Sequence, residues 1–229
     1  MTQTAKTVES AQFNIGEARF NMIEQQIRTW EVLDPVVLSV LDAVPREKFV
    51  AESQVGLAFA DVELPIGEGQ TMLSPKLEGR ILQALNIKKT DKVLLIGTGS
   101  GYLAALLATL AQHVHAVEIY PALSNTAQYR LQAQGIHNAT LYVGDGVNGF
   151  AAAAPYDVIV FAGSLPLRPI AAEKMLNVGG RLFAVVGDAP IMEATVTERV
   201  SEASFRHETI FETCLPVQEN APQATKFAF

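Results

Sequence analysis

The chain has 229 residues, of which 49% are hydrophobic and 18% are charged, and its formal net charge is −7. This composition excludes a disordered chain and leaves ample apolar residues for a core. The acidic balance disfavours general nucleic-acid binding, which needs Lys and Arg against phosphates, so no nucleic-acid partner is expected. No apolar run reaches membrane-spanning length and the polar start lacks an apolar signal region, so we expect a cytoplasmic protein with no membrane partner.

The first third of the chain is predicted to be helical. Phe20, Ile23 and Ile27 recur at helical spacing, with Gln and Arg residues between them, and indicate a first helix. Asp34-Pro35 predicts the start of a second helix, because Asp suits the N-cap and Pro suits the first turn. Pro45 is expected to end that helix.

The segment from Leu64 to Pro75 has Pro and Gly at both ends and is predicted to be a loop. A third helix is predicted from about Pro75 to Leu85, with a buried stripe of Leu77, Ile81, Leu82 and Leu85. No alternation typical of strands is found before Lys92.

From Lys92 onward, short apolar runs alternate with helix-like stretches. The runs predict strands at residues 93–96, 114–117, 140–143, 158–161 and 182–186. The stretches between them predict helices at residues 103–111, 122–134 and 170–178, with Gly135 and Gly179 as helix stops. Such alternation is typical of a doubly wound, mostly parallel α/β sheet that is covered on both faces.

Two further strands are predicted at residues 194–199 and 209–215, as an antiparallel pair that completes the sheet. We find no internal repeat or low-complexity linker, and therefore predict a single domain. Its parts are N-terminal helices and a substrate loop at about residues 13–90, a cofactor-binding sheet at about 91–217, and a tail at 218–229. The oligomeric state is left open.

The chain has one cysteine and four histidines. A single thiol can form no intramolecular disulfide, and the common cysteine-based zinc frameworks are absent. Cys214 lies in an apolar stretch, Ile210 to Val217, which predicts a small buried side chain rather than a reactive thiol. The histidines show no spacing shared with a metal site, so no metal is expected.

A glycine-rich loop, Gly97-Thr98-Gly99-Ser100-Gly101, joins the first strand of the sheet to a helix. Glycines at such a junction let the backbone turn sharply and approach a ligand closely. Glu118 ends the next strand, 21 residues after Gly97, where a carboxylate meets ribose hydroxyls in nucleotide-binding sheets. Asp145-Gly146 ends the strand after that and is predicted to reach the adenine side of the same crevice.

The residue after the loop, Tyr102, bears on the identity of the ligand. A dinucleotide loop needs a third glycine at this point, because its helix must approach a pyrophosphate closely. S-adenosylmethionine has no phosphate and needs no such approach. The spacing therefore favours S-adenosylmethionine over a nicotinamide or flavin dinucleotide.

The sequence resembles the protein-L-isoaspartate O-methyltransferases from about residue 20 to residue 217. The motifs that carry the resemblance are Val44-Pro45-Arg46-Glu47-Lys48-Phe49-Val50, Leu64-Pro65-Ile66-Gly67, Gly69-Gln70-Thr71, Gly97 to Tyr102, Gly144-Asp145-Gly146, Pro155-Tyr156-Asp157 and Gly179-Gly180-Arg181-Leu182. The resemblance implies a methyltransferase-type sheet. It also implies methyl transfer from S-adenosylmethionine to the free carboxylate of isoaspartyl residues in damaged proteins, a repair step that releases S-adenosylhomocysteine.

This reaction places few demands on catalytic side chains. A carboxylate with a pKa of about 4 is already ionised at neutral pH, so no general base is needed. The protein must align the partners and exclude water. The candidate catalytic residues are Thr71 and Ser74. The candidate cofactor-binding residues are Gly97, Thr98, Gly99, Ser100, Gly101, Tyr102, Glu118, Ile119, Asp145 and Gly146.

The chain departs from the family pattern at five positions on the predicted cofactor and substrate walls, two of which are Leu103, in place of a glutamine, and Gln218, in place of a threonine. Leu73 stands where the family usually has a serine, Lys76 where it has a histidine, and Leu95 where it has an acidic residue that helps to hold the methionine end of the cofactor. Three hypotheses follow from these departures. The chain is an isoaspartyl methyltransferase with an altered site, a methyltransferase for a different acceptor, or a non-catalytic protein that binds an adenosyl group.

Overall fold

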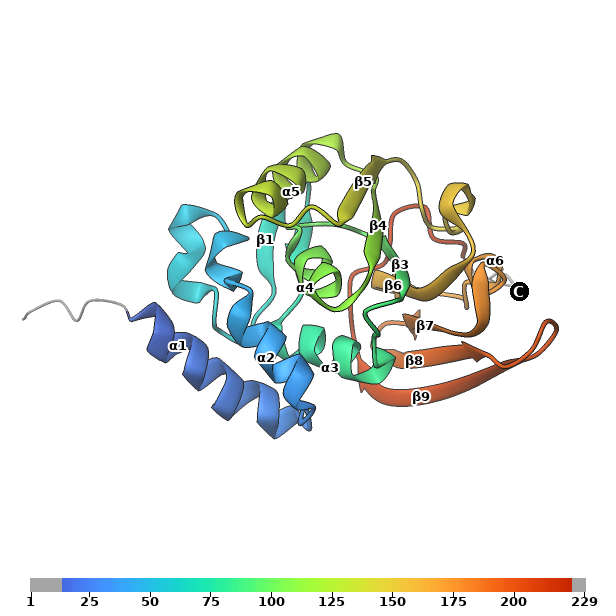
Figure 1. Ribbon diagram of the computed structural model, residues 1–229, viewed down its shortest axis with the longest axis horizontal. Coiled ribbons are helices and arrows are strands. Elements are labelled where there is room, and N and C mark those ends of the chain that lie inside the picture. The colour runs from blue at the N-terminus through green and yellow to red at the C-terminus, as the bar shows by residue number, and fades with distance from the viewer. Residues whose placement is uncertain (1–13, 224–229) are drawn as a thin grey trace, which may run out of the picture.

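The computed structural model describes residues 14–223 (Figure 1). Helix α1 (Ile15–Met22) runs along one edge of the molecule and continues through a π-helical turn at Ile23–Ile27. The predicted helix is therefore present, and Ile23 and Ile27 are buried in it, whereas Phe20 is 62% exposed. The reason is that α1 covers only the edge of the core, and Met22 takes the inward position beside Ile23.

Helices α2 (Pro35–Ala43) and α3 (Pro75–Leu85) confirm the predictions made from their caps and apolar stripes. The Asp34 carboxylate accepts hydrogen bonds from the backbone N–H groups of Val36 and Val37, at 2.7 and 3.3 Å. The four expected α3 side chains are buried, and Asn86 ends the helix in the left-handed conformation.

The segment predicted as a loop between these helices contains a β-hairpin. Strand β1 (Leu64–Gly67) pairs antiparallel with β2 (Gln70–Met72). The turn between the strands has positive φ at Gly67, Glu68 and Gly69, a conformation that glycine adopts at little cost. Pro and Gly therefore marked a tight hairpin here and not an irregular loop. The expectation of no strand before Lys92 was wrong for the same reason.

The main sheet has seven strands in the order β5-β4-β3-β6-β7-β8-β9. The strands from β5 to β7 are parallel to one another, whereas β7 and β8, and β8 and β9, pair antiparallel. Their bounds are Lys92–Ile96 for β3, His113–Glu118 for β4, Ala139–Val143 for β5, Tyr156–Leu165 for β6, Leu176–Asp188 for β7, Ile191–Arg199 for β8 and Phe205–Thr213 for β9. This arrangement confirms the predicted fold class, including the C-terminal antiparallel pair (Figure 1).

Helices α4 (Tyr102–Leu110) and α5 (Pro121–Ala133) follow β3 and β4 as predicted, and Gly135 ends α5 with a φ of 70°. The helix predicted at residues 170–178 is wrong in length, because α6 spans only Ile170–Glu173. Residues from Leu176 onward belong to β7, where Leu176 pairs with Tyr156 of β6. Gly179 consequently lies within a strand and stops no helix.

Both faces of the sheet are covered, in different ways. One face packs against α2, α3 and α4 in a large core that includes Leu95. The other face packs mainly against short segments, among them Ala172 of α6 and Ala221 near the C-terminus. Ala221 shows that part of the predicted tail packs on the body of the protein, while residues 224–229 lie outside the described residues.

Cys214 is exposed, so the prediction of a buried thiol was wrong. It follows directly after the last residue of β9, where the neighbouring Leu215 takes the inward position and is 3% exposed. In this apolar segment, Leu215 and not Cys214 therefore packs into the core.

Candidate functional site

The glycine-rich loop leaves the end of β3 in a tight turn. Gly97, Gly99 and Gly101 all have positive φ, at 88°, 53° and 89°. Gly101 also lies close to α5, because a Cβ atom added there would be 3.0 Å from the Cβ of Ala127. Both the backbone conformation and the packing therefore require glycine at this position.

Glu118, at the end of β4, holds the loop from the side. Its Oε2 accepts a hydrogen bond from the backbone N–H of Gly99 at 2.8 Å, and its Oε1 accepts one from Tyr120 N–H at 3.1 Å. Asp145 follows the end of β5, the next strand of the sheet. Its Oδ1 accepts from Val147 N–H and its Oδ2 from the side chain of Asn220.

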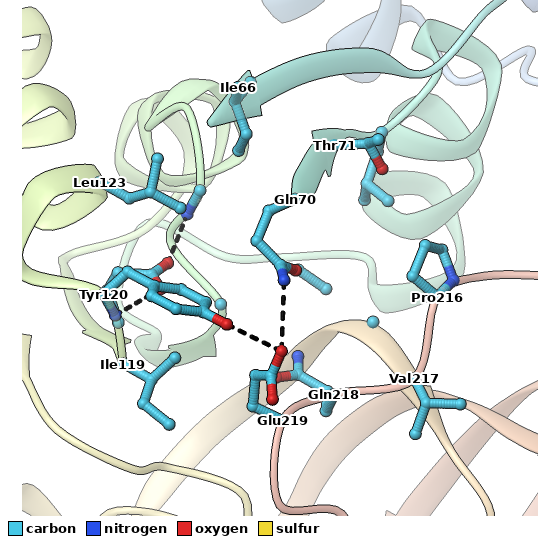
Figure 2. A pocket seen from close by; sticks show the side chains of 16 residues that line it. Ile66, Gln70, Thr71, Ile119, Tyr120, Leu123, Pro216, Val217, Gln218 and Glu219 are labelled. Carbon is cyan, nitrogen blue, oxygen red and sulfur yellow. Dashed lines mark hydrogen bonds between the residues drawn. The ribbon is translucent and has the colours of Figure 1, made fainter. Parts of the chain in front are cut away.

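The predicted adenosyl-binding residues meet at one end of the sheet. Gly97, Glu118, Ile119, Asp145 and Gly146 line one cavity of about 250 Å³. An adjoining cavity of about 560 Å³ shares Gly97, Glu118 and Ile119 with it and extends to the β1–β2 hairpin (Figure 2). Together they lie at the carboxyl ends of the parallel strands β3, β4, β5 and β6, the edge at which α/β sheets of this type bind ligands.

Sixteen residues line the larger cavity. Its wall combines three parts of the chain that are far apart in the sequence: the hairpin, the loop after β4 and the C-terminal segment (Figure 2). The residues that line it are Ile66, Gln70, Thr71, Leu73, Gly97, Gly99, Glu118, Ile119, Tyr120, Leu123, Ala162, Gly163, Pro216, Val217, Gln218 and Glu219.

Three polar side chains connect these parts across the cavity. The hydroxyl of Tyr120 donates to Glu219 Oε1 at 2.8 Å, and Gln70 Nε2 donates to the same oxygen at 3.4 Å (Figure 2). The hydrogen bond to Glu219 raises the pKa of Tyr120. We call Gln70, Tyr120 and Glu219 the clasp. Tyr120 and Glu219 were not predicted as site residues, because no local pattern links residues so far apart in the sequence.

The C-terminal segment is anchored next to the clasp. Gln218 Nε2 donates to the carbonyl of Ile96 at 3.2 Å, and the backbone N–H of Gln218 donates to Ser164 O at 2.9 Å. At Gly163 a Cβ atom would be 3.1 Å from both the Gln218 side chain and the Pro216 carbonyl. This segment therefore forms part of the cavity wall, although it was predicted as a tail from residue 218.

The two candidate catalytic residues lie in different surroundings. Thr71 lines the larger cavity, and its hydroxyl donates to Glu63 Oε2 at 2.9 Å. Ser74 lines a separate cavity that also includes Trp30 and Lys76. Lys76 forms an ion pair with Asp61 at 2.7 Å and stacks on Trp30 at 4.0 Å from the ring centre.

The remaining loop residues border a third cavity around the glycine loop, of about 290 Å³, which adjoins the first two and is distinct from the Ser74 cavity. Thr98 and Ser100 line it together with Gly97, Gly99 and a buried carboxylate, Glu78 of α3. Tyr102, by contrast, lines none of the three cavities and is fully buried, 5.5 Å from the Phe49 ring. The structure thus brings together the predicted loop and strand-end residues and places Tyr102 in the core.

Glu78 was not a sequence candidate. It forms a buried ion pair with Arg46, whose guanidinium also lies 4.9 Å from the ring centre of Tyr102. Burial raises the pKa of Glu78 to about 8, against the opposing effect of Arg46. Burial, with the Glu78 charge as a further cause, also raises the pKa of Tyr102. The sequence feature that could have indicated Glu78 is its position as a single Glu on the otherwise apolar, buried side of α3.

Within residues 14–223, no group of three or more His, Cys, Asp or Glu side chains could hold a metal ion. The same part of the chain has no helix both long and apolar enough to cross a membrane.

Comparison with known proteins identifies the family. The family model described as protein-L-isoaspartate(D-aspartate) O-methyltransferase matches residues 17–219. The protein-L-isoaspartate O-methyltransferase of Protochlamydia amoebophila is 43% identical over 186 residues, which cover 81% of this chain and 88% of that protein. Protein-L-isoaspartate O-methyltransferase 1 of Geotalea uraniireducens is 38% identical over 198 residues, covering 86% and 90%.

Solved structures share the fold. A structure titled protein-L-isoaspartate O-methyltransferase superposes with a TM-score of 0.77 at 23% identity, covering 88% of this chain and 66% of that one. A Plasmodium falciparum structure, described as a putative protein-L-isoaspartate O-methyltransferase in complex with S-adenosyl-L-homocysteine, gives a TM-score of 0.75 at 17% identity, covering 90% and 98%. The resemblance seen in the sequence motifs is confirmed, and the chain belongs to the protein-L-isoaspartate (D-aspartate) O-methyltransferase family of S-adenosylmethionine-dependent enzymes.

Proposed function

We propose that this chain methylates the free carboxylate of isoaspartyl residues in damaged proteins, with S-adenosylmethionine as methyl donor and S-adenosylhomocysteine as product. The observation that carries the proposal is the meeting of the glycine loop, Glu118 and Asp145 at cavities that open toward the β1–β2 hairpin. Membership of the family supports the reaction type and the acceptor.

The residues present fit an adenosyl cofactor. The Glu118 carboxylate is held by two backbone N–H groups, and each oxygen keeps a lone pair for a ribose hydroxyl. We assign the ribose to Glu118, and the adenine side to Ile119, Asp145 and Gly146, which line the adjoining cavity. Thr98 Oγ1 is buried beside the loop without a hydrogen-bond partner in the described residues, as expected of a group that a ligand satisfies.

The chemistry needs alignment more than proton transfer. When bound, the cofactor supplies an activated methyl group, and an ionised carboxylate attacks it without a general base. The chain's own residues then have to bind the acceptor, orient it and exclude water. We assign the acceptor contact to Thr71, since its side chain lines the larger cavity whereas Ser74 lines a different one.

Leu73 favours a second candidate function. It is 7% exposed and lines the cavity beside Thr71, so this part of the wall is apolar where the family usually has a hydroxyl. A methyltransferase that acts on a different, less polar acceptor would use such a wall. The non-catalytic hypothesis predicts adenosyl binding with no transfer to any acceptor.

One pair of measurements tests the proposal. Methyl transfer to an isoaspartyl peptide should exceed transfer to the same peptide with a normal aspartyl residue, and calorimetry should detect S-adenosylhomocysteine binding. Binding without transfer to either peptide would contradict the proposed acceptor and leave the other two hypotheses. No binding at millimolar ligand would contradict the cofactor assignment itself.

We also infer that the protein works in the cytoplasm, on protein and not on nucleic acid. The support is its use of an intracellular cofactor, its single cysteine and its net charge of −7. Activity that is unchanged by added DNA or RNA in the peptide assay is the expected result.

A further inference from the structure

The third cavity beside the glycine loop contains a feature that the adenosyl assignment does not use. Its wall includes Glu78 of α3, a carboxylate that is only 1% exposed. This cavity shares Thr71, Gly97 and Gly99 with the larger one, so the two adjoin around the loop. A ligand that lies along the glycine loop therefore passes close to Glu78.

Arg46 occupies only one oxygen of the Glu78 carboxylate. Its Nη1 pairs with Oε2, while Nε donates to Ala58 O at 2.7 Å and Nη2 donates to Leu73 O at 2.6 Å. Within residues 14–223, Oε1 of Glu78 accepts no hydrogen bond. Since Glu78 lines the cavity, this oxygen can accept a hydrogen bond from a donor that a ligand brings there.

A second polar atom at the same cavity also lacks a partner. Thr98 is 3% exposed, and its Oγ1 has no hydrogen bond in the described part of the chain. Thr98 and Glu78 line the cavity together. Two oxygens without a hydrogen-bond donor at one cavity indicate a ligand group with several N–H donors, and a carboxylate that lines the same cavity as a hydroxyl favours a cation.

The other carboxylates that line the three cavities already accept hydrogen bonds from the protein. Both oxygens of Glu118 accept backbone N–H groups, and both oxygens of Asp145 accept hydrogen bonds. Glu219 is exposed and belongs to the clasp. Glu78 is thus the buried carboxylate with an oxygen to spare.

We propose that Glu78 binds the α-ammonium group at the methionine end of the cofactor, through Oε1 and with Thr98 Oγ1 beside it. This inference rests on the proposed function, because it concerns the same cofactor. An ammonium group has three N–H donors and would satisfy both oxygens. The buried β3 residue Leu95 cannot contribute such a contact, so the charge for this end of the ligand comes from α3.

The proposal has a consequence for pH. The charged and titratable groups around Glu78 are Arg46 and Tyr102, with the Arg19–Glu47 ion pair next to them. Since burial raises the pKa of Glu78 to about 8, the carboxyl is largely protonated in the free protein at neutral pH. Binding of a cation then releases a proton, so the affinity should rise by about tenfold per pH unit up to about pH 8.

The test compares two ligands on the full chain by calorimetry. S-Adenosylhomocysteine has the amino-acid end, whereas 5′-methylthioadenosine has the same adenosyl group without it. Glu78→Gln should weaken S-adenosylhomocysteine binding by about 10- to 100-fold and leave 5′-methylthioadenosine binding within twofold. Glu47→Gln is the matched control: it alters a carboxylate that is also buried and paired with an arginine but lines none of the three cavities, and both affinities should stay unchanged.

Two outcomes would overturn the inference: unchanged S-adenosylhomocysteine binding in Glu78→Gln, or an equal loss for both ligands, which would indicate a merely structural role. If the wild-type protein bound neither ligand, the proposed function would fail as well. The wild-type pH series from 6 to 8 needs no variant and covers the case in which Glu78→Gln does not fold. It should show tighter S-adenosylhomocysteine binding at higher pH and constant 5′-methylthioadenosine binding, and parallel curves would contradict the assignment.

Discussion

The adenosyl half and the opposite half of the site are built by different means. Gly97 to Gly101, Glu118 and Asp145 come from consecutive strands, and backbone N–H groups hold the Glu118 carboxylate in place. The opposite half joins α3, the hairpin and the C-terminal segment, and the hydrogen bond from Gln70 to Glu219 spans 149 residues. The first half follows from the order of strands in the sheet. The second exists only after distant segments have packed.

The halves also differ in the kind of interaction that supports them. In the adenosyl half, glycine conformations and backbone hydrogen bonds dominate. The opposite half depends on side chains, with the buried Arg46–Glu78 pair below the loop and the clasp across the cavity. We therefore expect substitutions to affect the two halves separately.

The largest effect is expected from Arg46→Met. It removes the donor to the buried Glu78 carboxyl and to the carbonyls of Ala58 and Leu73, and these buried acceptors are left without a partner, so stability should fall by about 3–5 kcal/mol in urea unfolding. Arg28→Met is the control, because it breaks an exposed ion pair with Glu24 and should cost at most about 0.5 kcal/mol. Similar losses for both variants would mean that the buried pair gives the opposite half no special support.

Gly101→Ala should destabilise the adenosyl half by about 2–5 kcal/mol, because it adds a steric conflict with Ala127 to the strain of a positive φ. Gly135→Ala is the matched variant, since Gly135 has a positive φ of 70° but nothing within 4 Å of an added Cβ. It should lose only about 1–2 kcal/mol. Chemical denaturation measures the difference, and equal losses would show that backbone conformation alone requires the glycine.

Glu118→Gln should weaken S-adenosylhomocysteine and 5′-methylthioadenosine binding alike, by about 10- to 100-fold, because both ligands carry the ribose. This pattern differs from the selective loss expected of Glu78→Gln and so separates the two halves of the site. The exposed Glu208 on β9 provides the control, and Glu208→Gln should change neither affinity. A selective loss in Glu118→Gln would contradict the ribose assignment.

The smallest effect is expected from Tyr120→Phe, which removes the hydroxyl that donates to Glu219. The clasp is exposed, so we expect the dissociation rate of S-adenosylhomocysteine to rise only about two- to fivefold in stopped-flow measurements. Tyr129→Phe, on the exposed surface of α5, should leave the rate unchanged. An identical rate in both variants would show that the clasp does not hinder ligand release.

Much of the fold could be predicted because its signals are local. Asp34-Pro35 predicted the start of α2, and the alternation of apolar runs with helical stretches predicted the parallel sheet. The glycine loop and Glu118 were recognisable because parallel strands bring their carboxyl ends to one edge whatever else the chain does. Each of these inferences needs only neighbouring residues or a fixed spacing.

The features that could not be predicted depend on partners far away in the sequence. Phe20 and Cys214 are exposed because a neighbouring residue, Met22 or Leu215, packs into the core instead. Strand β7 starts earlier than predicted because Leu176 pairs with β6. Pairing between Arg46 and Glu78 requires that two segments 32 residues apart exclude water together. The sequence determines where an adenosyl group can bind, through local conformation. The tertiary structure decides which charged side chains face that group, because burial and ion pairing arise only when distant segments pack together.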